Sequence, residues 1–98
     1  MKKENAFQSQ LICDILKIFP DADIVKNDAN YRQGFPDLTV FYKDKFAILE
    51  VKRTEKASHR PNQDYYIDKY NKCESGYFVY PENKEEVLNH LERRFKQT

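Results

Sequence analysis

Apolar residues recur at helical spacing in three separate stretches of the chain. The first runs from about residue 4 to residue 19, ends before Pro20, and carries one apolar face: Phe7, Leu11, Ile15 and Ile18. The second begins at Pro61, which suits the first turn of a helix, and its stripe is Tyr66, Ile67, Tyr70 and Cys73. The third follows Asn83 and Glu86, which are spaced like a capping box, and carries Val87, Leu88, Leu91 and Phe95. The pattern predicts three amphipathic helices.

Shorter apolar stretches between these helices predict four β-strands. They are Ala22–Lys26, Asp37–Tyr42, Lys45–Lys52 and Tyr77–Tyr80. The run from Phe46 to Leu49 is apolar on both faces, which indicates a central strand covered on both sides. The predicted order is helix, three strands, helix, strand, helix. Such an order is typical of the α/β class, with helices packed on a mixed sheet, and we expect a single domain over residues 1–98.

Composition narrows the function classes. Charged residues make up 34% of the 98 residues, yet the net charge is only +1, so contact with nucleic acid requires a local basic patch. The two cysteines, Cys13 and Cys73, have no metal-type spacing, which favours reduced thiols in the cytoplasm. No apolar run is long enough to cross a membrane, and no signal peptide is recognisable, so a membrane partner is not expected.

The predicted hairpin brings two acids together. If its turn has two residues, Tyr42 faces Lys45, and the pairing continues outward until Asp37 faces Glu50. Directly opposed residues share a face, with Cβ atoms about 4.5–5.5 Å apart. Two carboxylates at that distance repel each other unless a cation lies between them, and a divalent ion with oxygen ligands is the natural candidate. Lys52 follows Glu50 by two residues and therefore projects from the same face.

These residues carry a resemblance to a known family. Gly34-Phe35-Pro36-Asp37 followed by Glu50-Val51-Lys52 resembles the signature of the PD-(D/E)XK nuclease superfamily. Gln63, after Pro61 at the start of the second predicted helix, is similar to the small VRR-NUC branch, whose stand-alone members are often carried by bacteriophages. The element order also matches the restriction-endonuclease-like αβββαβ core followed by a C-terminal helix, so the resemblance spans nearly the whole chain.

The resemblance implies roles for individual residues. Asp37 and Glu50 are expected to bind Mg²⁺, with Mn²⁺ as a substitute, and the Val51 carbonyl is expected to complete the protein ligands. Lys52 would position or polarise the attacking water, or offset charge on the phosphate. The alternatives are ordinary ones: Asp37 is common at a strand start after proline, and Lys52 can be solvated or paired with Glu50. Glu50 itself follows a covered apolar run, where a carboxylate needs a partner or a metal.

Two further polar residues are expected near the predicted site. Gln63 lies on the inward stripe of its helix, where an amide needs hydrogen-bond partners, although it also suits a local bond at the helix start. Glu4 resembles the acid that the family often places on its first helix, and it is expected to contact the metal or a water. The alternative for Glu4 is an acid that stabilises the first helical turn.

Basic residues in loops and at strand ends near the predicted site are candidates for contacts to nucleic-acid phosphates, and a solvated surface is the alternative. They are Lys26, Arg32, Arg53, Lys56 and Arg60. Aromatic rings on which a base can stack are offered by Tyr31, in the loop before the second predicted strand, and by Tyr65 and Tyr66 in the second predicted helix; for Tyr66, packing in the core is the alternative.

We therefore expect a divalent-metal-dependent endonuclease that hydrolyses DNA phosphodiester bonds. The chain has no evident recognition helix for the major groove, so recognition of DNA shape and backbone is expected. The resemblance further implies branched DNA such as a Holliday junction, a homodimer with two sites, and the cytoplasm of a bacterial host if a bacteriophage carries the gene. The alternatives are a non-catalytic nucleic-acid-binding module and a nuclease subunit of a larger DNA-processing complex.

Overall fold

The computed structural model describes residues 2–28 and 30–96, with side chains from residue 5 onward. Its helices and strands follow one another as α1 (Lys2–Ile18), β1 (Asp23–Lys26), β2 (Leu38–Tyr42), β3 (Lys45–Val51), α2 (Pro61–Asn71), β4 (Gly76–Val79) and α3 (Lys84–Phe95). The predicted element order and the α/β class are therefore confirmed.

The four strands form one mixed sheet in the order β1-β2-β3-β4. The pairs β1–β2 and β2–β3 are antiparallel, and β3–β4 is parallel. Tyr42 faces Lys45 and Leu38 faces Leu49, which confirms the predicted register of the hairpin. The turn is tight enough that Lys43 adopts a left-handed φ of 56°. One further step outward from the Leu38–Leu49 pair leads to Asp37 and Glu50.

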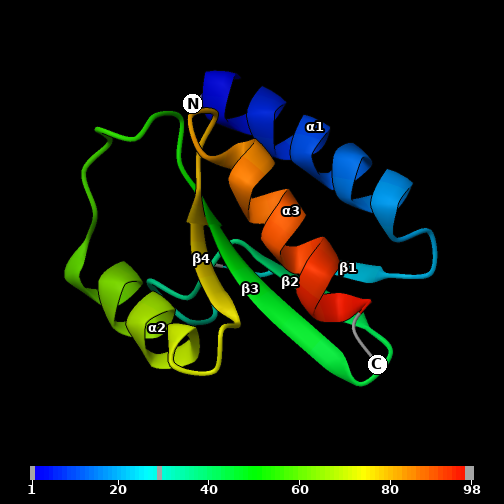
Figure 1. Cartoon of the computed structure of the whole chain (residues 1–98). Coiled ribbons are helices and arrows are strands. Elements are labelled where there is room, and N and C mark those ends of the chain that lie inside the picture. The colour runs from blue at the N-terminus through cyan, green and yellow to red at the C-terminus, as the bar shows by residue number, and fades with distance from the viewer. Residues whose placement is uncertain (1, 29, 97–98) are drawn as a thin grey trace.

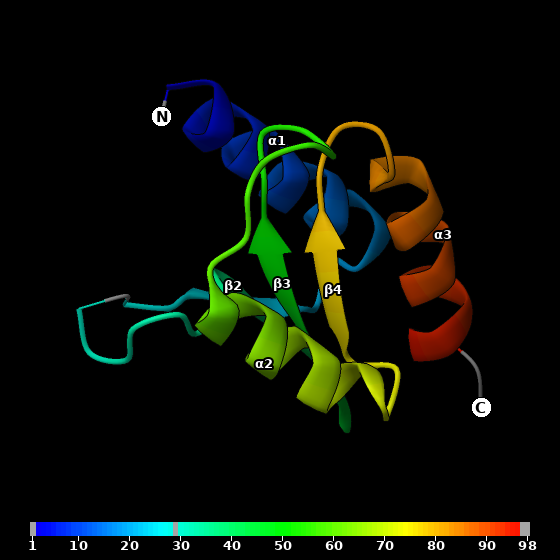
Figure 2. The same ribbon diagram turned by 90° about the vertical axis from the view of Figure 1, so that its left-hand side faces the viewer.

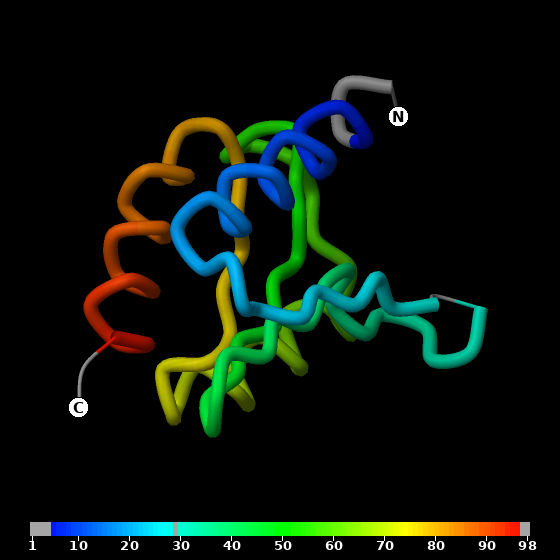
Figure 3. The backbone as a smooth tube through the Cα atoms, turned by 90° about the vertical axis from the view of Figure 1, so that its right-hand side faces the viewer, coloured from blue at the N-terminus to red at the C-terminus, as the bar shows by residue number. Residues whose placement is uncertain are grey.

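The helices lie in two layers. α1 and α3 cover one face of the sheet, and α2 covers the other (Figure 1 and Figure 2). α1 and α3 lie side by side on their face (Figure 3). None of the helices in the described part of the chain is long and apolar enough to cross a membrane.

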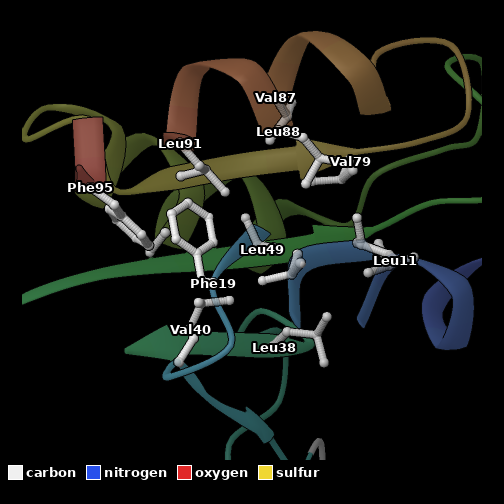
Figure 4. Packing of buried hydrophobic residues seen from close by; sticks show 14 residues of the cluster. Leu11, Phe19, Leu38, Val40, Leu49, Val79, Val87, Leu88, Leu91 and Phe95 are labelled. Carbon is white, nitrogen blue, oxygen red and sulfur yellow. The ribbon is translucent and has the colours of Figure 1, made fainter. Parts of the chain in front are cut away.

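The main core lies between the sheet and the α1–α3 layer (Figure 4). Leu11 and Ile15 of α1 are fully buried there, and the Phe19 ring packs at 5.0 Å from the Tyr42 ring and 5.3 Å from the Phe95 ring. The remaining core residues are Ala22, just before β1, and a set from β2, β3, β4 and α3: Leu38, Val40, Ala47, Leu49, Val51, Val79, Val87, Leu88, Leu91 and Phe95. The stripes predicted for the first and third helices are thus the ones that pack the core.

α2 covers the opposite face of the sheet over β3 and β4. Ile67 of α2 is buried, and the Tyr70 ring meets the Phe46 ring edge-on at 6.0 Å. Over β1 and β2 this face is open at Phe41 and Val25, which are 47% and 46% exposed. Alternate residues of a strand point to opposite faces. Because Phe46 faces α2, Glu50, four residues later in β3, projects from the same face.

Two local predictions were wrong. Asn83 precedes α3 but makes no side-chain capping bond. Its Nδ2 donates to the Phe78 carbonyl and its Oδ1 accepts from the Tyr80 N–H, both at 2.9 Å, so it pairs with the outer edge of β4. Cys73, predicted on the inward stripe of the second helix, is exposed because α2 ends at Asn71.

An ion pair joins the two helices that cover the main core. The Lys84 ammonium donates to Asp14 Oδ2 at 2.7 Å, and Gln10 Nε2 donates to Asp14 Oδ1 at 2.9 Å. The Asp14 and Lys84 side chains are 19% and 23% exposed, so solvent screens the pair only in part. The hydrogen bond from Lys84 holds the pKa of the Asp14 carboxyl below its ordinary value.

Lys84→Met is expected to lower the free energy of unfolding by about 1 kcal/mol at pH 7, because it removes this pair. A carboxyl with a lowered pKa in the folded state stabilises the fold above the unfolded-state pKa of about 3.9, and that contribution is lost as the pH falls through the folded-state value. Urea unfolding should therefore separate wild type from variant at pH 7 and bring them together near pH 3. Lys72→Met, at an exposed lysine, is the matched control; an equal loss in both variants would contradict a role for the pair.

Candidate active site

The candidate site lies where β3 ends. Asp37, the residue before β2, accepts the Val51 N–H through Oδ2 at 2.9 Å. The Asp37 side chain thus extends the β2–β3 pairing one step past Leu38 and Leu49. In a strand, the N–H and C=O of one residue point to the same neighbour. The Val51 carbonyl is therefore directed to the side on which Asp37 lies, as the predicted ligand set requires.

An amide joins the two buried charges of the site. Gln63 Nε2 donates to Glu50 Oε2 at 2.7 Å, and Gln63 Oε1 accepts from Lys52 Nζ at 2.7 Å. Glu50 is 4% exposed and Lys52 is 8% exposed, so both charges have left bulk water. The same Oε1 accepts the N–H of Arg60, the residue before α2, at 3.0 Å. Gln63 therefore fixes both side chains and caps the helix that carries it.

The ammonium of Lys52 has a second partner. It donates to the Ser58 carbonyl at 3.0 Å, in addition to Gln63. An ammonium has three N–H donors. Among the described residues, these two bonds use two of them, so the third is available to a ligand. Because the side chain is held from two directions, that donor has a defined position and needs little reorganisation to act on a substrate.

The loop between β3 and α2 is fixed over the site at both ends; it runs from the end of β3 down to the start of α2 (Figure 2). Near β3, Thr54 Oγ1 donates to Glu82 Oε2 at 2.9 Å, and this bond lowers the pKa of the Glu82 carboxyl. Near α2, the His59 ring stacks on Phe78 at 4.0 Å, with its Nδ1 at 2.9 Å from Asp64 Oδ1. His59 thus holds the loop and does not line the site.

These residues enclose a polar cavity of about 350 Å³. Its lining consists of Asp37, Glu50, Lys52, Arg53, Ala57, Ser58, Arg60 and Gln63. The volume lies within the range of about 300–1,000 Å³ that is usual for ligand sites. The four side chains on which the sequence prediction depended therefore share one cavity, together with two of the five predicted basic residues.

Other predicted residues lie elsewhere. Lys26 is exposed on β1, Lys56 is exposed in the loop after β3, and Arg32 is exposed in the loop between β1 and β2; none of them lines this cavity. Val51 takes part through its backbone alone. The side chain of Glu4 lies outside the described residues, although the N-terminal half of α1 lies at the end of the sheet where β3 ends (Figure 1 and Figure 2).

The donors of the cavity fit a hard divalent cation. Asp37 and Glu50 offer carboxylate oxygens, and Val51 offers a carbonyl oxygen. Mg²⁺ is usually held by one or two carboxylates and keeps several waters. Within residues 5–28 and 30–96, no group of three or more acidic, histidine or cysteine side chains is arranged to hold a metal. Two carboxylates and one carbonyl suit an ion that retains several water ligands.

Sequence reasoning missed the supports of the site. No side-chain pattern marks the Ser58 carbonyl, because it is a backbone group in a loop, and none marks the Glu82 carboxylate, because its partner Thr54 is 28 residues away in the sequence. The His59–Asp64 contact has a weak signal: a histidine just before a predicted helix and an acid in its first turn. No pattern in the sequence indicates that this ring stacks on Phe78.

Gln63→Ala is expected to lower the free energy of unfolding by about 2–3 kcal/mol, because it removes hydrogen bonds from a buried carboxylate and a buried ammonium. Gln63→Glu keeps the size and the bond to Lys52, but it cannot donate to Glu50, so it should also destabilise at pH 7. Asn89→Ala, at an exposed helical amide, should change stability by less than about 0.5 kcal/mol. Equal unfolding midpoints for all three variants in urea would refute the bridging role.

Comparison with known protein families, with curated proteins and with solved structures found no match in any of the three. The function is therefore inferred from the residues of the cavity and from the resemblance of the short motifs.

Proposed function

We propose that this chain is a divalent-metal-dependent endonuclease that hydrolyses phosphodiester bonds of DNA. The observation that carries the proposal is the single polar cavity shared by Asp37, Glu50, Lys52 and Gln63. Two carboxylates, one ammonium and a bridging amide form the set that the motif resemblance to the PD-(D/E)XK superfamily, and to its VRR-NUC branch, requires. The order of the helices and strands is the one expected for that superfamily.

Asp37 and Glu50 would hold the cation, with the Val51 carbonyl beside them. When bound, Mg²⁺ supplies Lewis acidity that lowers the pKa of a water and offsets charge on the phosphate. The hydrogen bonds from the Val51 N–H and from Gln63 fix one oxygen of each carboxylate. The two acids are thus oriented before a substrate arrives, which is the preorganisation that catalysis by charge stabilisation depends on.

Lys52 acts on the reacting atoms in this proposal. Its remaining donor holds the attacking water in line or stabilises the negative charge that builds on the phosphate. Gln63 is a positioning residue, because it sets the distance between the ammonium and Glu50. Arg53 and Arg60 line the same cavity and supply cations for the phosphates on either side of the bond that is cut.

A branched DNA substrate suits the surface of the domain. The described helices pack the sheet, and the net charge is +1, so sequence readout by a basic recognition helix is not supported. What remains is contact with the phosphate backbone and selection by DNA shape. Two copies of the chain, each with one site, would cut two strands of a junction, as the resemblance to small resolvase-like nucleases suggests.

The test is cleavage of a labelled four-way junction, a flap and a linear duplex, with Mg²⁺ or with EDTA. Glu50→Gln and Lys52→Met should each lower the cleavage rate by at least about 100-fold, since each removes a charge that acts on the reacting phosphate. Glu85→Gln and Lys72→Met replace exposed residues of the same types and should cleave like wild type.

The outcomes separate the alternatives. Metal-dependent cutting of the junction alone supports a resolvase-type nuclease. Metal-dependent cutting of all three substrates supports phosphodiester hydrolysis at this site without a preference for branched DNA. Binding without cutting would favour a non-catalytic module, and activity that appears only with added partner proteins would favour a subunit of a larger complex. Equal activity of the site variants and their controls would refute this cavity as the active site.

A further inference from the structure

A second concave region lies on the segment between β1 and β2, which protrudes from the body of the molecule (Figure 2 and Figure 3). It is a hollow of about 470 Å³ lined by Asn27, Asp28, Tyr31, Arg32 and Phe35. None of these residues lines the candidate active site. We refer to this hollow, defined by these five residues, as the aromatic hollow.

The aromatic hollow is tied to the active site by backbone bonds. The Asn27 N–H donates to the Asp37 carbonyl at 2.8 Å. The Asn27 side chain donates to the Pro36 carbonyl and to Thr39 Oγ1, both at 2.9 Å. The two ends of the loop are thus clamped together, one residue from the acid that lines the active site. The position of the hollow relative to Asp37 is therefore fixed.

A third, smaller hollow lies between the start of α2 and the loop that carries the aromatic hollow. It has a volume of about 240 Å³ and is lined by Gln33, Gly34, Arg60, Pro61 and Asn62. Arg60 lines both this hollow and the active site. Gly34 has a φ of 82°, and a Cβ there would lie 2.2 Å from Asn62 Cβ, so the loop and α2 touch without room for a side chain. The lining of this hollow thus runs from Arg60, at the active site, to Gln33 and Gly34, which lie between Arg32 and Phe35 of the aromatic hollow in the sequence; we refer to this course as the track.

The side chains of the aromatic hollow suit a nucleobase and its phosphate. The Tyr31 side chain is 86% exposed, so its ring is available on the surface. Phe35 is held by an edge-on contact with Tyr66 at 5.0 Å between ring centroids. The exposed guanidinium of Arg32 lies between these residues in sequence and supplies a cation. Base stacking on aromatic rings with an adjacent arginine is the usual way in which proteins bind single strands.

The acidic member of the lining, Asp28, shapes the loop. Asp28 Oδ1 accepts the Asn30 N–H at 2.8 Å, and the Asp28 carbonyl accepts the N–H of Tyr31 and of Arg32 at 3.1 and 3.3 Å. Asp28 is thereby engaged in shaping the loop. A free inorganic anion would use Arg32 alone, whereas the exposed ring beside it favours a ligand with a flat, uncharged face.

We infer that the aromatic hollow binds an unpaired nucleobase of the strand that runs through the active site. The inference rests on the proposed function and refines its substrate: the DNA has an unpaired segment next to the bond that is cut. The phosphates follow the track past Arg60, and Arg32 binds the phosphate beside the stacked base. A blunt duplex cannot fill the hollow, because its bases are stacked within the helix.

The test measures equilibrium binding by fluorescence anisotropy, with the Glu50→Gln protein so that no substrate is consumed. Two hairpin duplexes are compared, one blunt and one with a short single-stranded extension. Tyr31→Ala should weaken binding of the extended DNA by about 5- to 150-fold, the range that the loss of one base–aromatic stack produces, and leave binding of the blunt DNA unchanged. An extension that lacks its bases should bind the parent protein as weakly as the complete extension binds Tyr31→Ala. The Tyr31→Ala variant should not weaken binding of the base-free extension any further.

Controls separate stacking from a general loss of surface. Tyr31→Phe keeps the ring and should bind like the parent protein. Phe41→Ala removes another exposed ring, on the open face of the sheet, and should also leave binding unchanged. An equal loss for blunt and extended DNA, or no loss in Tyr31→Ala, would overturn the inference. The nuclease proposal alone would be refuted if the protein with native Glu50 binds the extension through Tyr31 but cuts no DNA with Mg²⁺. Failure to bind either DNA would refute both proposals.

Discussion

The hydrogen bonds of Gln63 to Lys52 and Glu50 are the constraint on which the site and much of the α2 side of the molecule depend. A buried carboxylate and a buried ammonium are costly unless each is hydrogen-bonded and compensated by opposite charge. One amide bonds to both side chains, because its nitrogen donates to Glu50 Oε2 and its oxygen accepts from the lysine. The amide lies on the first turn of α2. A shift of the helix along the sheet would therefore break these hydrogen bonds and leave the two buried charged groups without them.

The position of α2 in turn determines the shape of the surface around the site. The N–H before the helix bonds to the same amide, which places Arg60 at the rim of the cavity. The contact between Gly34 and Asn62 then aligns the loop between β1 and β2 with the start of α2. The start of α2 therefore borders both the active site and the smaller hollow, and the loop residues of the smaller hollow, Gln33 and Gly34, adjoin the aromatic hollow in the sequence.

The sequence predicted what depends on local pattern. A two-residue turn fixes the pairing of a hairpin, so the approach of Asp37 to Glu50 and Val51 followed from counting residues. Helical spacing likewise placed Gln63 toward the sheet. What escaped prediction depends on tertiary partners: Ser58 contributes a backbone carbonyl, which no side-chain pattern marks. The prediction that Asn83 caps α3 was wrong because its side-chain amide bonds instead to backbone groups at the edge and end of β4. That strand edge exists only after the sheet has formed.

The same physical reasoning links the aromatic hollow to catalysis. Asn27 bonds to the carbonyl of Asp37, and the carboxylate of Asp37 bonds to the Val51 N–H at the end of β3. In the proposed function, a base seated on Tyr31 would therefore act on a loop that is joined by consecutive hydrogen bonds to Asp37, one of the two proposed metal ligands. A ligand that stiffens this loop also restricts the motion of Asp37. By the same coupling, a ligand that stabilises one conformation of the loop also stabilises the Asp37 conformation that goes with it. In the proposed function, selection of an unpaired strand and orientation of the metal site would then be one event, by which this domain would couple substrate shape to cleavage.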